Sequence, residues 1–325
     1  ERWGRWVCLE VEPQLGVYFE DMEGMMIAPA PEEARDSVGE TEESFTAPFL
    51  RDRSVMLALL TRMAVSGMLR SVAAVYYAFG VFAVIKRYVD GVPVLRPVWD
   101  GRGPNRGWRR PPWVALSSPC SFADVDASRV GGGMIYSAVA DLPDFFYTLL
   151  LPPQAWGYFG VPLGIGTQEL LSFARKRGVD LPDLDPKLPM LAVAVCVMGW
   201  SWAPFIAHCV LLAILRLSLG SNFWSAHMVF RSFSPQLWLA EVLTWGYIDD
   251  IGAMKVVQSH EEGRDWGRRF LAHMRGVLEK LGFGMHKEEV REGVHSLGVE
   301  MEGRPYTLRV ALAKLIILVG ATEEL

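Results

Sequence analysis

The chain has 325 residues, which is enough for one large domain or two modest ones. Hydrophobic residues make up 51% of the chain and charged residues 21%, which excludes a protein that is disordered as a whole. The net charge of −5 by itself argues against a protein that binds nucleic acid. However, the charge is distributed unevenly along the sequence. Because the sequence opens on Glu1 with no basic or apolar leader, we interpret it as a fragment or a processed chain and not as a secreted precursor.

Residues 1–50 are acidic. They hold twelve carboxylates and three arginines, so this segment carries −9 and the rest of the chain +4. A stretch rich in proline and glutamate at residues 29–43 offers little apolar surface to bury. We therefore predict a loosely ordered N-terminal extension over residues 1–50.

A helix and a basic hairpin are expected next. Apolar residues recur at helical spacing over residues 54–70, and two strand-like runs, residues 81–85 and 93–99, flank an Asp90-Gly91 turn. Residues 86–110 contain seven basic side chains and two acids, interleaved with tyrosine and tryptophan. Such a stretch suits a phosphate backbone with stacked bases, and it suits a solvated basic face equally well.

The middle of the chain is predicted to form loops, a strand and a helix. Residues 101–112 are rich in glycine, proline and arginine and are predicted to be loop. The glycine triplet at residues 131–133 is predicted to form a turn and not a phosphate-binding loop. A phosphate-binding loop would need a lysine or the start of a helix after the glycines, and neither follows here. Residues 136–140 are predicted to form a short apolar strand that ends at Asp141, and residues 167–176 to form a helix.

Residues 188–215 contain no charged side chain and are long enough to cross a bilayer. However, Pro189, Gly199 and Pro204 interrupt this run, and its period changes midway. We predict a buried strand over residues 188–197, a turn at 198–201 and an apolar helix over 203–217. No stable membrane association is expected, and a membrane span is the alternative.

The pair Asp249-Asp250 lies between two apolar strand-like runs, residues 242–246 and 251–257, and a helix is predicted at residues 265–281. A hairpin would present the two carboxylates at its tip, where they repel each other unless a cation lies between them. Magnesium is the natural counter-ion because it prefers carboxylate oxygen. An ordinary acidic turn is the alternative, since aspartate is common in turns.

If the strand that ends at Asp141 pairs beside this hairpin, Asp141, Asp249 and Asp250 converge on one point. Three carboxylates can hold two magnesium ions, or manganese in their place, about 3.5–4 Å apart for in-line phosphoryl transfer. Asp144 and Asp185 are further candidate ligands, although Asp144 is expected to point elsewhere and Asp185 lies in a proline-rich loop.

The cysteines Cys8, Cys120, Cys196 and Cys209 show no paired spacing. They indicate reduced thiols and an intracellular protein of the nucleus or the cytoplasm. Zinc is not expected, because no histidine stands at ligand spacing from a cysteine pair, and His208 beside Cys209 is an isolated neighbour.

In order and spacing, residues 54–307 resemble the reverse transcriptases of retroelements such as retrotransposons. The motifs that carry the resemblance are, in chain order, Val81-Phe82-Ala83 through Lys86-Arg87; Arg96, Asp100, Arg102 and Asn105; Asp141 with Phe146 five residues later; Tyr158 through Pro162; Met198 through Pro204; Tyr247-Ile248-Asp249-Asp250; and Leu281-Gly282-Phe283 with Lys287, then Leu297-Gly298-Val299. Each motif alone is weak, whereas their order along one chain is specific.

The resemblance implies an α+β protein with the right-hand fold of polymerases, in which helices flank an antiparallel palm sheet and a fingers subdomain is attached. It assigns residues 51–305 to fingers and palm and residues 306–325 to the start of a truncated thumb. The implied activity is that of an RNA-directed DNA polymerase, a nucleotidyltransferase that adds dNTPs to a primer on an RNA or DNA template with two magnesium ions.

The resemblance also implies roles for single residues. Asp141, Asp249 and Asp250 would be catalytic and would hold the metals, while Lys86 or Arg87, together with Arg96, would grip the triphosphate. Phe146 would exclude a ribose 2′-hydroxyl, Met198 and Gly199 would border the nascent base pair, Lys287 would protonate or steady the pyrophosphate, and Leu297-Gly298 would brace the primer end. As alternatives, Phe146 and Met198 belong to the core, and Arg102 merely pairs with Asp100.

Several features depart from the family pattern. Met198 stands where many relatives carry Gln or Phe, Phe145 stands where a small residue is common, and residues 217–240 form an unusual join before the catalytic hairpin. The alternative function is therefore that of a catalytically inactive retroelement remnant that binds nucleic acid or a partner protein. A third possibility, a membrane or scaffold protein, depends on the apolar run at residues 188–215.

Overall fold

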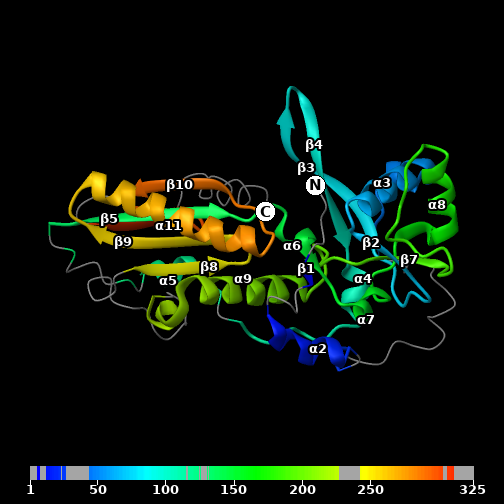
Figure 1. Ribbon diagram of the computed structural model, residues 1–325, viewed down its shortest axis with the longest axis horizontal. Coiled ribbons are helices and arrows are strands. Elements are labelled where there is room, and N and C mark those ends of the chain that lie inside the picture. Colours follow the sequence, from blue (N-terminus) through cyan, green and yellow to red (C-terminus); the bar gives the residue numbers. More distant parts are fainter. Residues whose placement is uncertain are drawn as a thin grey trace, which may run out of the picture. The chain divides into compact units, whose positions relative to one another are not determined.

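The computed structural model describes residues 6–7, 12–22, 24–26, 44–114, 116–123, 125, 130, 132–226, 242–302 and 306–310 (Figure 1). The chain divides into two compact units, Glu1–Pro112 with Asp144–Ala207 and Trp113–Pro143 with His208–Leu325. Both units combine helices with antiparallel strand pairs, which confirms the expectation of an α+β protein at this level. The segment assigned to fingers and palm is thus shared between two units.

A four-stranded antiparallel sheet forms the centre of the second unit, with strand order β10-β5-β9-β8. Its strands are β5 (Met134–Asp141), β8 (Leu243–Tyr247), β9 (Asp250–Val257) and β10 (His286–Glu292). The central strands β5 and β9 pair along their whole length, from Met134 opposite Val257 to Asp141 opposite Asp250. Both strands are mainly apolar because both faces of the sheet are covered.

Helices cover one face of this sheet, namely α11 (His260–Lys280) and the part of α9 (Ala203–Leu219) that belongs to the second unit. Gly263 of α11 lies against the ring of Tyr136, where a Cβ would clash. Gly246 of β8 lies in the same way against two leucines of α9. The two helices also contact each other, because His273 forms a 3.0 Å hydrogen bond with the carbonyl of Ser218.

The opposite face packs on a three-stranded antiparallel sheet of β11 (Val294–Ser296), β12 (Val299–Glu302) and β13 (Thr307–Val310). Alternate residues of a strand point to opposite faces, so every second residue of β5, β8 and β9 turns to this side. These residues form a core cluster with the neighbouring elements: Phe122, Val125, Ile135, Leu243, Trp245, Met254, Val294, Val299 and Met301. The sheet is therefore held between two packed layers.

The first unit contains the helices α3 (Arg53–Val65) and α8 (Thr167–Arg175), the strand pair β2 (Leu69–Val72) and β7 (Met190–Val193), and the hairpin β3 (Gly80–Val89) and β4 (Val92–Asp100). The hairpin turns at Asp90 and Gly91, whose φ values of 50° and 78° suit a two-residue turn that follows the strand twist. The predicted hairpin and its turn are confirmed, and both strands are longer than predicted.

Two boundaries differ from the prediction. The helix predicted over residues 54–70 ends at Val65, where the N–H groups of Gly67 and Met68 return to carbonyls of the last turn and the chain enters β2. The loop predicted at residues 101–112 contains one helical turn, α4 (Arg102–Asn105), whose Asn105 N–H bonds the carbonyl of Gly101. In both places hydrogen bonds between nearby backbone groups outweighed the apolar spacing or the glycine and proline content.

The uncharged run at residues 188–215 is broken near the predicted position. The strand β7 is shorter than predicted, and a turn at residues 198–202 separates it from α9. Among the described residues, the segment Ala203–Asn222 is one helix whose length and apolar composition would allow it to cross a membrane. Its most apolar window is 56% buried within the protein, as in the core helix of a globular protein.

Part of the acidic N-terminal segment is folded into the first unit. Leu15 and Phe19 are buried there, and Arg109 donates from its backbone N–H to the carbonyl of Met25 and from Nε to that of Met26. Apolar side chains of this described part thus pack in a core, and the expectation of a loosely ordered extension over residues 1–50 stays a prediction. Residues 27–43 and 311–325, and with them most of the expected thumb, lie outside the described residues.

The remaining elements are short. They are β1 (Trp6–Val7), η1 (Pro13–Leu15), α2 (Gly16–Glu20), η3 (Pro48–Arg51), α5 (Pro119–Ala123), α6 (Phe145–Thr148), β6 (Leu149–Leu150), α7 (Pro153–Trp156), η4 (Pro162–Gly164), η5 (Gly220–Asn222) and α10 (Phe223–Ala226). Within the described part of the chain, Cys120, Cys196 and Cys209 carry thiols and form no disulfides, whereas Cys8 lies outside it.

Candidate functional site

Three carboxylates meet at one end of the central sheet. Asp141 ends β5 and stands opposite Asp250, the first residue of β9. Asp249 lies in the two-residue turn between β8 and β9, and its carbonyl accepts a 2.8 Å hydrogen bond from the N–H of Leu142. One carboxylate oxygen from each aspartate lies within 4.8 Å of the other two. The carboxylates thus converge, as the pairing of β5 beside this hairpin requires.

The donor set fits a hard divalent cation. It consists of carboxylate oxygens that are partly exposed to solvent, and such oxygens are the ligands that magnesium and manganese prefer. Like charges that stand directly opposite each other destabilise a sheet, so a cation at this point would lower the free energy of the folded chain.

Lys287 reaches the same carboxylates from β10. Its Nζ donates to Oδ2 of Asp141 at 2.6 Å, and Nδ1 of His286 lies 3.6 Å from that oxygen. A bulge in β10 and a φ of 51° at Lys287 turn its side chain out of the regular alternation. The hydrogen bond to Asp141 raises the pKa of Lys287, partial burial opposes the rise, and the attraction of all three carboxylates adds to it. Lys287 is therefore a charged neighbour of the carboxylates at neutral pH.

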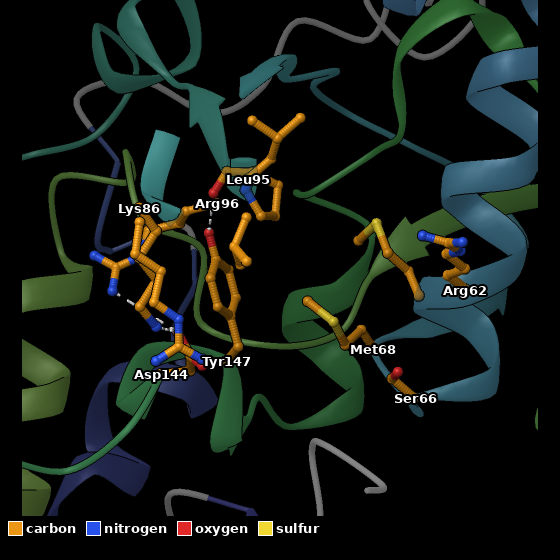
Figure 2. A pocket seen from close by; sticks show the side chains of 12 residues that line it. Arg62, Ser66, Met68, Lys86, Leu95, Arg96, Asp144 and Tyr147 are labelled. Carbon is orange, nitrogen blue, oxygen red and sulfur yellow. Dashed lines mark hydrogen bonds and ion pairs between the residues drawn. The ribbon is translucent and has the colours of Figure 1, made fainter. Parts of the chain in front are cut away.

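A pocket of about 440 Å³ lies within the first unit (Figure 2). Its polar lining residues are Arg62, Ser66, Lys86, Arg87, Arg96, Asp144 and Tyr147. Lys86 and Arg96 point toward Asp144, with Lys86 Nζ 2.8 Å and Arg96 Nη2 3.8 Å from its Oδ1 (Figure 2). Four basic side chains against a single carboxylate make the pocket electropositive, so it suits an anionic ligand such as a phosphate.

Arg96, one of the arginines in this pocket, has an unused donor. Nε of Arg96 is buried and has no hydrogen-bond partner among the described residues. The neighbouring Tyr147 is 3% exposed and donates its hydroxyl to the carbonyl of Pro97 at 2.6 Å. Burial raises the pKa of Tyr147, so its phenol stays neutral and leaves the positive charge of the pocket intact. A buried donor without a partner is costly, and a ligand oxygen that reached Arg96 would remove that cost.

Asp100, Arg102 and Asn105 brace the base of the β3–β4 hairpin. Asp100 is 5% exposed and accepts hydrogen bonds from Arg102 Nη2 at 2.7 Å and from the N–H of Phe45 at 2.6 Å. Burial opposes the ionisation of Asp100, but these hydrogen bonds prevail and hold its pKa below the ordinary value. Asn105 donates to the carbonyl of Gly199 at 2.7 Å. The pairing of Arg102 with Asp100, stated as an alternative above, is confirmed.

Met198 and Gly199 form a turn that contacts the end of this hairpin. The carbonyl of Met198 accepts a 3.1 Å hydrogen bond from the N–H of Trp99. Gly199 has a φ of 115°, and a Cβ at this position would lie 1.9 Å from the carbonyl oxygen of Trp99. Glycine is therefore required here by the close approach of two backbones, whatever its neighbours bind.

Of the other sequence candidates, Asp144 lines the pocket, whereas Phe145 and Phe146 do not. Phe146 is half-buried in α6 and does not line the pocket, so its role in sugar selection stays a prediction. Phe145 is 1% exposed and belongs to the core. Asp144 lies in the basic pocket, and Asp185 accepts a 2.9 Å hydrogen bond from the N–H of Lys187.

Sequence reasoning missed three side chains at these sites, namely Arg62, Tyr147 and His286. His286 could have been found, since it precedes Lys287 in the same motif. Tyr147 could have been found in the same way, since it follows Phe146, whereas Arg62 carries no such signal because tertiary packing alone brings it to the pocket. No protein-family model matches the chain, and no curated protein matches it.

Proposed function

We propose that this chain is an RNA-directed DNA polymerase of the reverse transcriptase type. In this proposal the central sheet of the second unit is the palm of a right-hand fold, and the β3–β4 hairpin belongs to the fingers. The observation that carries the proposal is the convergence of Asp141, Asp249 and Asp250 at the strand ends, with ligand oxygens within 4.8 Å of one another. The order of the sequence motifs around these residues supports it independently of the geometry.

The proposed reaction joins the 3′-oxygen of a primer to the α-phosphorus of a dNTP and releases pyrophosphate. Two bound magnesium ions would activate the attacking hydroxyl and stabilise the leaving group. Asp141 and Asp249 would hold these ions, and Asp250 would contribute less directly. Lys287, whose ammonium group contacts Asp141, would neutralise or protonate the pyrophosphate.

The basic pocket supports a grip on the triphosphate. Lys86 and Arg87 come from β3 and Arg96 from the paired strand β4, so one hairpin carries all three cations. An arginine fork matches phosphate oxygens, and Arg96 has a buried donor to offer. Phe146 would then exclude a 2′-hydroxyl by steric contact, while Met198 and Gly199 would border the nascent base pair.

The exposed side chains of the β3–β4 hairpin support the proposal that this hairpin contacts a template strand. Ile85 is 54% exposed and Tyr88 is 64% exposed, and the basic residues Lys86 and Arg87 lie between them in the sequence. Exposed apolar and aromatic groups beside cations suit the stacked bases and phosphates of a primer–template duplex and its single-stranded end.

Primer extension tests the proposal. A DNA primer annealed to an RNA template should be extended by the protein with dNTPs and magnesium or manganese, and EDTA should stop the reaction. Asp249→Asn should extend no primer while binding the primer–template as the parent does. A parent that binds primer–template but extends it no better than Asp249→Asn would contradict the proposal and favour the inactive remnant.

A further inference from the structure

His208 is a buried polar side chain in an apolar helix. It is 0% exposed, and its neighbours on α9 include Ile206, Val210 and Leu211, each at most 1% exposed. A polar group in such surroundings is unfavourable unless it forms hydrogen bonds. Nδ1 of His208 accepts a 3.2 Å hydrogen bond from the backbone N–H of Ile248.

The helix face that carries His208 runs along the strand before the carboxylates. His208, Leu211 and Leu215 follow one another at helical spacing and so share one face of α9. At Gly246 a Cβ would lie 2.9 Å from Leu215 Cδ1 and 3.0 Å from Leu211 Cδ2. The leucines therefore contact the strand at Gly246, and His208 contacts the turn at Ile248.

Ile248 needs such a support. Its φ is 58°, a left-handed conformation that β-branched residues rarely adopt. It stands between Tyr247, the last residue of β8, and Asp249, so the conformation of this one residue sets the direction in which the turn presents its carboxylates. A hydrogen bond to its N–H opposes a change to a more ordinary conformation.

We propose that His208 is a positioning residue that holds the Ile248 turn and thereby orients Asp249 and Asp250. Because Nδ1 accepts a hydrogen bond, the imidazole carries its proton on Nε2. The inference that this orientation serves metal binding rests on the proposed function. The inference that His208 restrains the conformation of the turn depends only on the contact between His208 and Ile248.

Two substitutions at one position test the contact. His208→Asn keeps an acceptor, because Oδ1 of asparagine occupies nearly the same place along the side chain as Nδ1. His208→Leu fills the space of the imidazole with an apolar side chain and removes the acceptor. Ile214→Ala is the matched control, since Ile214 is a 0% exposed residue of the same helix and its loss lowers stability without touching the turn.

Amide hydrogen exchange without metal is the first measurement. The Ile248 amide should exchange about tenfold faster or more in His208→Leu than in the parent, and His208→Asn should stay close to the parent. Equal exchange rates at Ile248 in His208→Leu and Ile214→Ala would overturn the proposal. A melting temperature for each variant ensures that the comparison is made between folded proteins.

Binding of Mn²⁺, followed by electron paramagnetic resonance, is the second measurement. His208→Leu should weaken the affinity by about 10- to 100-fold, the usual cost of losing a group that orients metal ligands, whereas Ile214→Ala should not. If the Ile248 amide exchanges faster in His208→Leu but the Mn²⁺ affinity is unchanged, the inference that His208 orients the metal ligands is overturned. If the parent binds no Mn²⁺ at all, the proposed polymerase function fails. The exchange rates then still show whether His208 restrains the conformation of the Ile248 turn.

Discussion

Asp141 and Asp250 stand directly opposite each other across the antiparallel pair of β5 and β9. Two carboxylates in this position repel, and Lys287 contacts Asp141 and attracts the neighbouring carboxylates. A cation bound between these strand ends would relieve the repulsion, and the following predictions probe the proposed cation site.

Removing a charge from the carboxylates should abolish catalysis. We expect Asp141→Asn and Asp249→Asn each to lower the rate of primer extension on the order of a thousandfold or more, because each leaves the ions short of a ligand. Asp250→Asn should have a smaller effect. Single-turnover primer extension measures the rate, and filter binding of the primer–template, which should stay unchanged, is the control. Normal extension by Asp249→Asn would refute the polymerase assignment.

Removing Lys287 should have opposite effects on metal binding and on catalysis. Lys287→Met frees Asp141 from a competing cation, so Mn²⁺ affinity should rise by about two- to fivefold, the range expected for an exposed ion pair. Primer extension should slow, since the cation near the pyrophosphate is lost. Lys280→Met, at the exposed end of α11, serves as the control. A fall in Mn²⁺ affinity would mean that Lys287 organises the carboxylates and does not compete with the metal.

Removing the carboxylate that lines the basic pocket should strengthen anion binding. In Asp144→Asn, Lys86 and Arg96 lose their carboxylate partner, and we expect the affinity for tripolyphosphate to rise by several-fold. The gain should shrink at high salt because screening weakens partly exposed charges. Isothermal titration calorimetry measures the affinity, and Asp185→Asn is the matched control. Weaker binding in Asp144→Asn would indicate that Asp144 holds the two cations in place for the ligand.

Shortening Phe146 should relax sugar selection. Phe146→Val should raise ribonucleotide incorporation relative to deoxynucleotide incorporation by roughly 10- to 100-fold, since removal of a steric contact is worth that much. Competitive primer extension with dNTP and rNTP mixtures gives the ratio. Phe145→Leu, which changes the buried neighbour, should lower stability and leave the ratio unchanged. Unchanged selectivity in Phe146→Val would assign Phe146 to packing.

The brace at Asp100 should contribute to stability in a pH-dependent way. Asp100→Asn weakens the buried bonds to Arg102 and Phe45, and the free energy of unfolding should fall by about 1–3 kcal/mol. The pKa of Asp100 is lowered in the folded state, so its contribution is complete above the ordinary pKa of about 3.9 and is lost as the pH falls through the lowered value.

Urea unfolding at several pH values checks this prediction. The stability difference between the parent and Asp100→Asn should be largest near neutral pH and should shrink toward low pH. Asp90→Asn, at the exposed turn of the same hairpin, should show no such difference. A difference that did not change with pH would mean that packing, and not the charge of Asp100, causes it.

The sequence by itself determined the elements whose causes are local. The Asp90-Gly91 turn, the strand before Asp141 and the helix α8 follow from turn residues and apolar spacing within a few residues. The adjacency of Asp249 and Asp250 likewise needs no tertiary structure. For this reason the candidate carboxylates could be named from the sequence.

Tertiary structure alone decided which distant residues meet. The register that sets Asp141 opposite Asp250 depends on which residues of β5 and β9 pack on the three-stranded sheet and which on the helices. A shift of one strand by one residue would turn its carboxylate to the other face. The contacts of Lys287 with Asp141 and of His208 with Ile248 join residues from separate elements. No local pattern encodes such contacts, because they form only when the packing of whole layers brings the elements together.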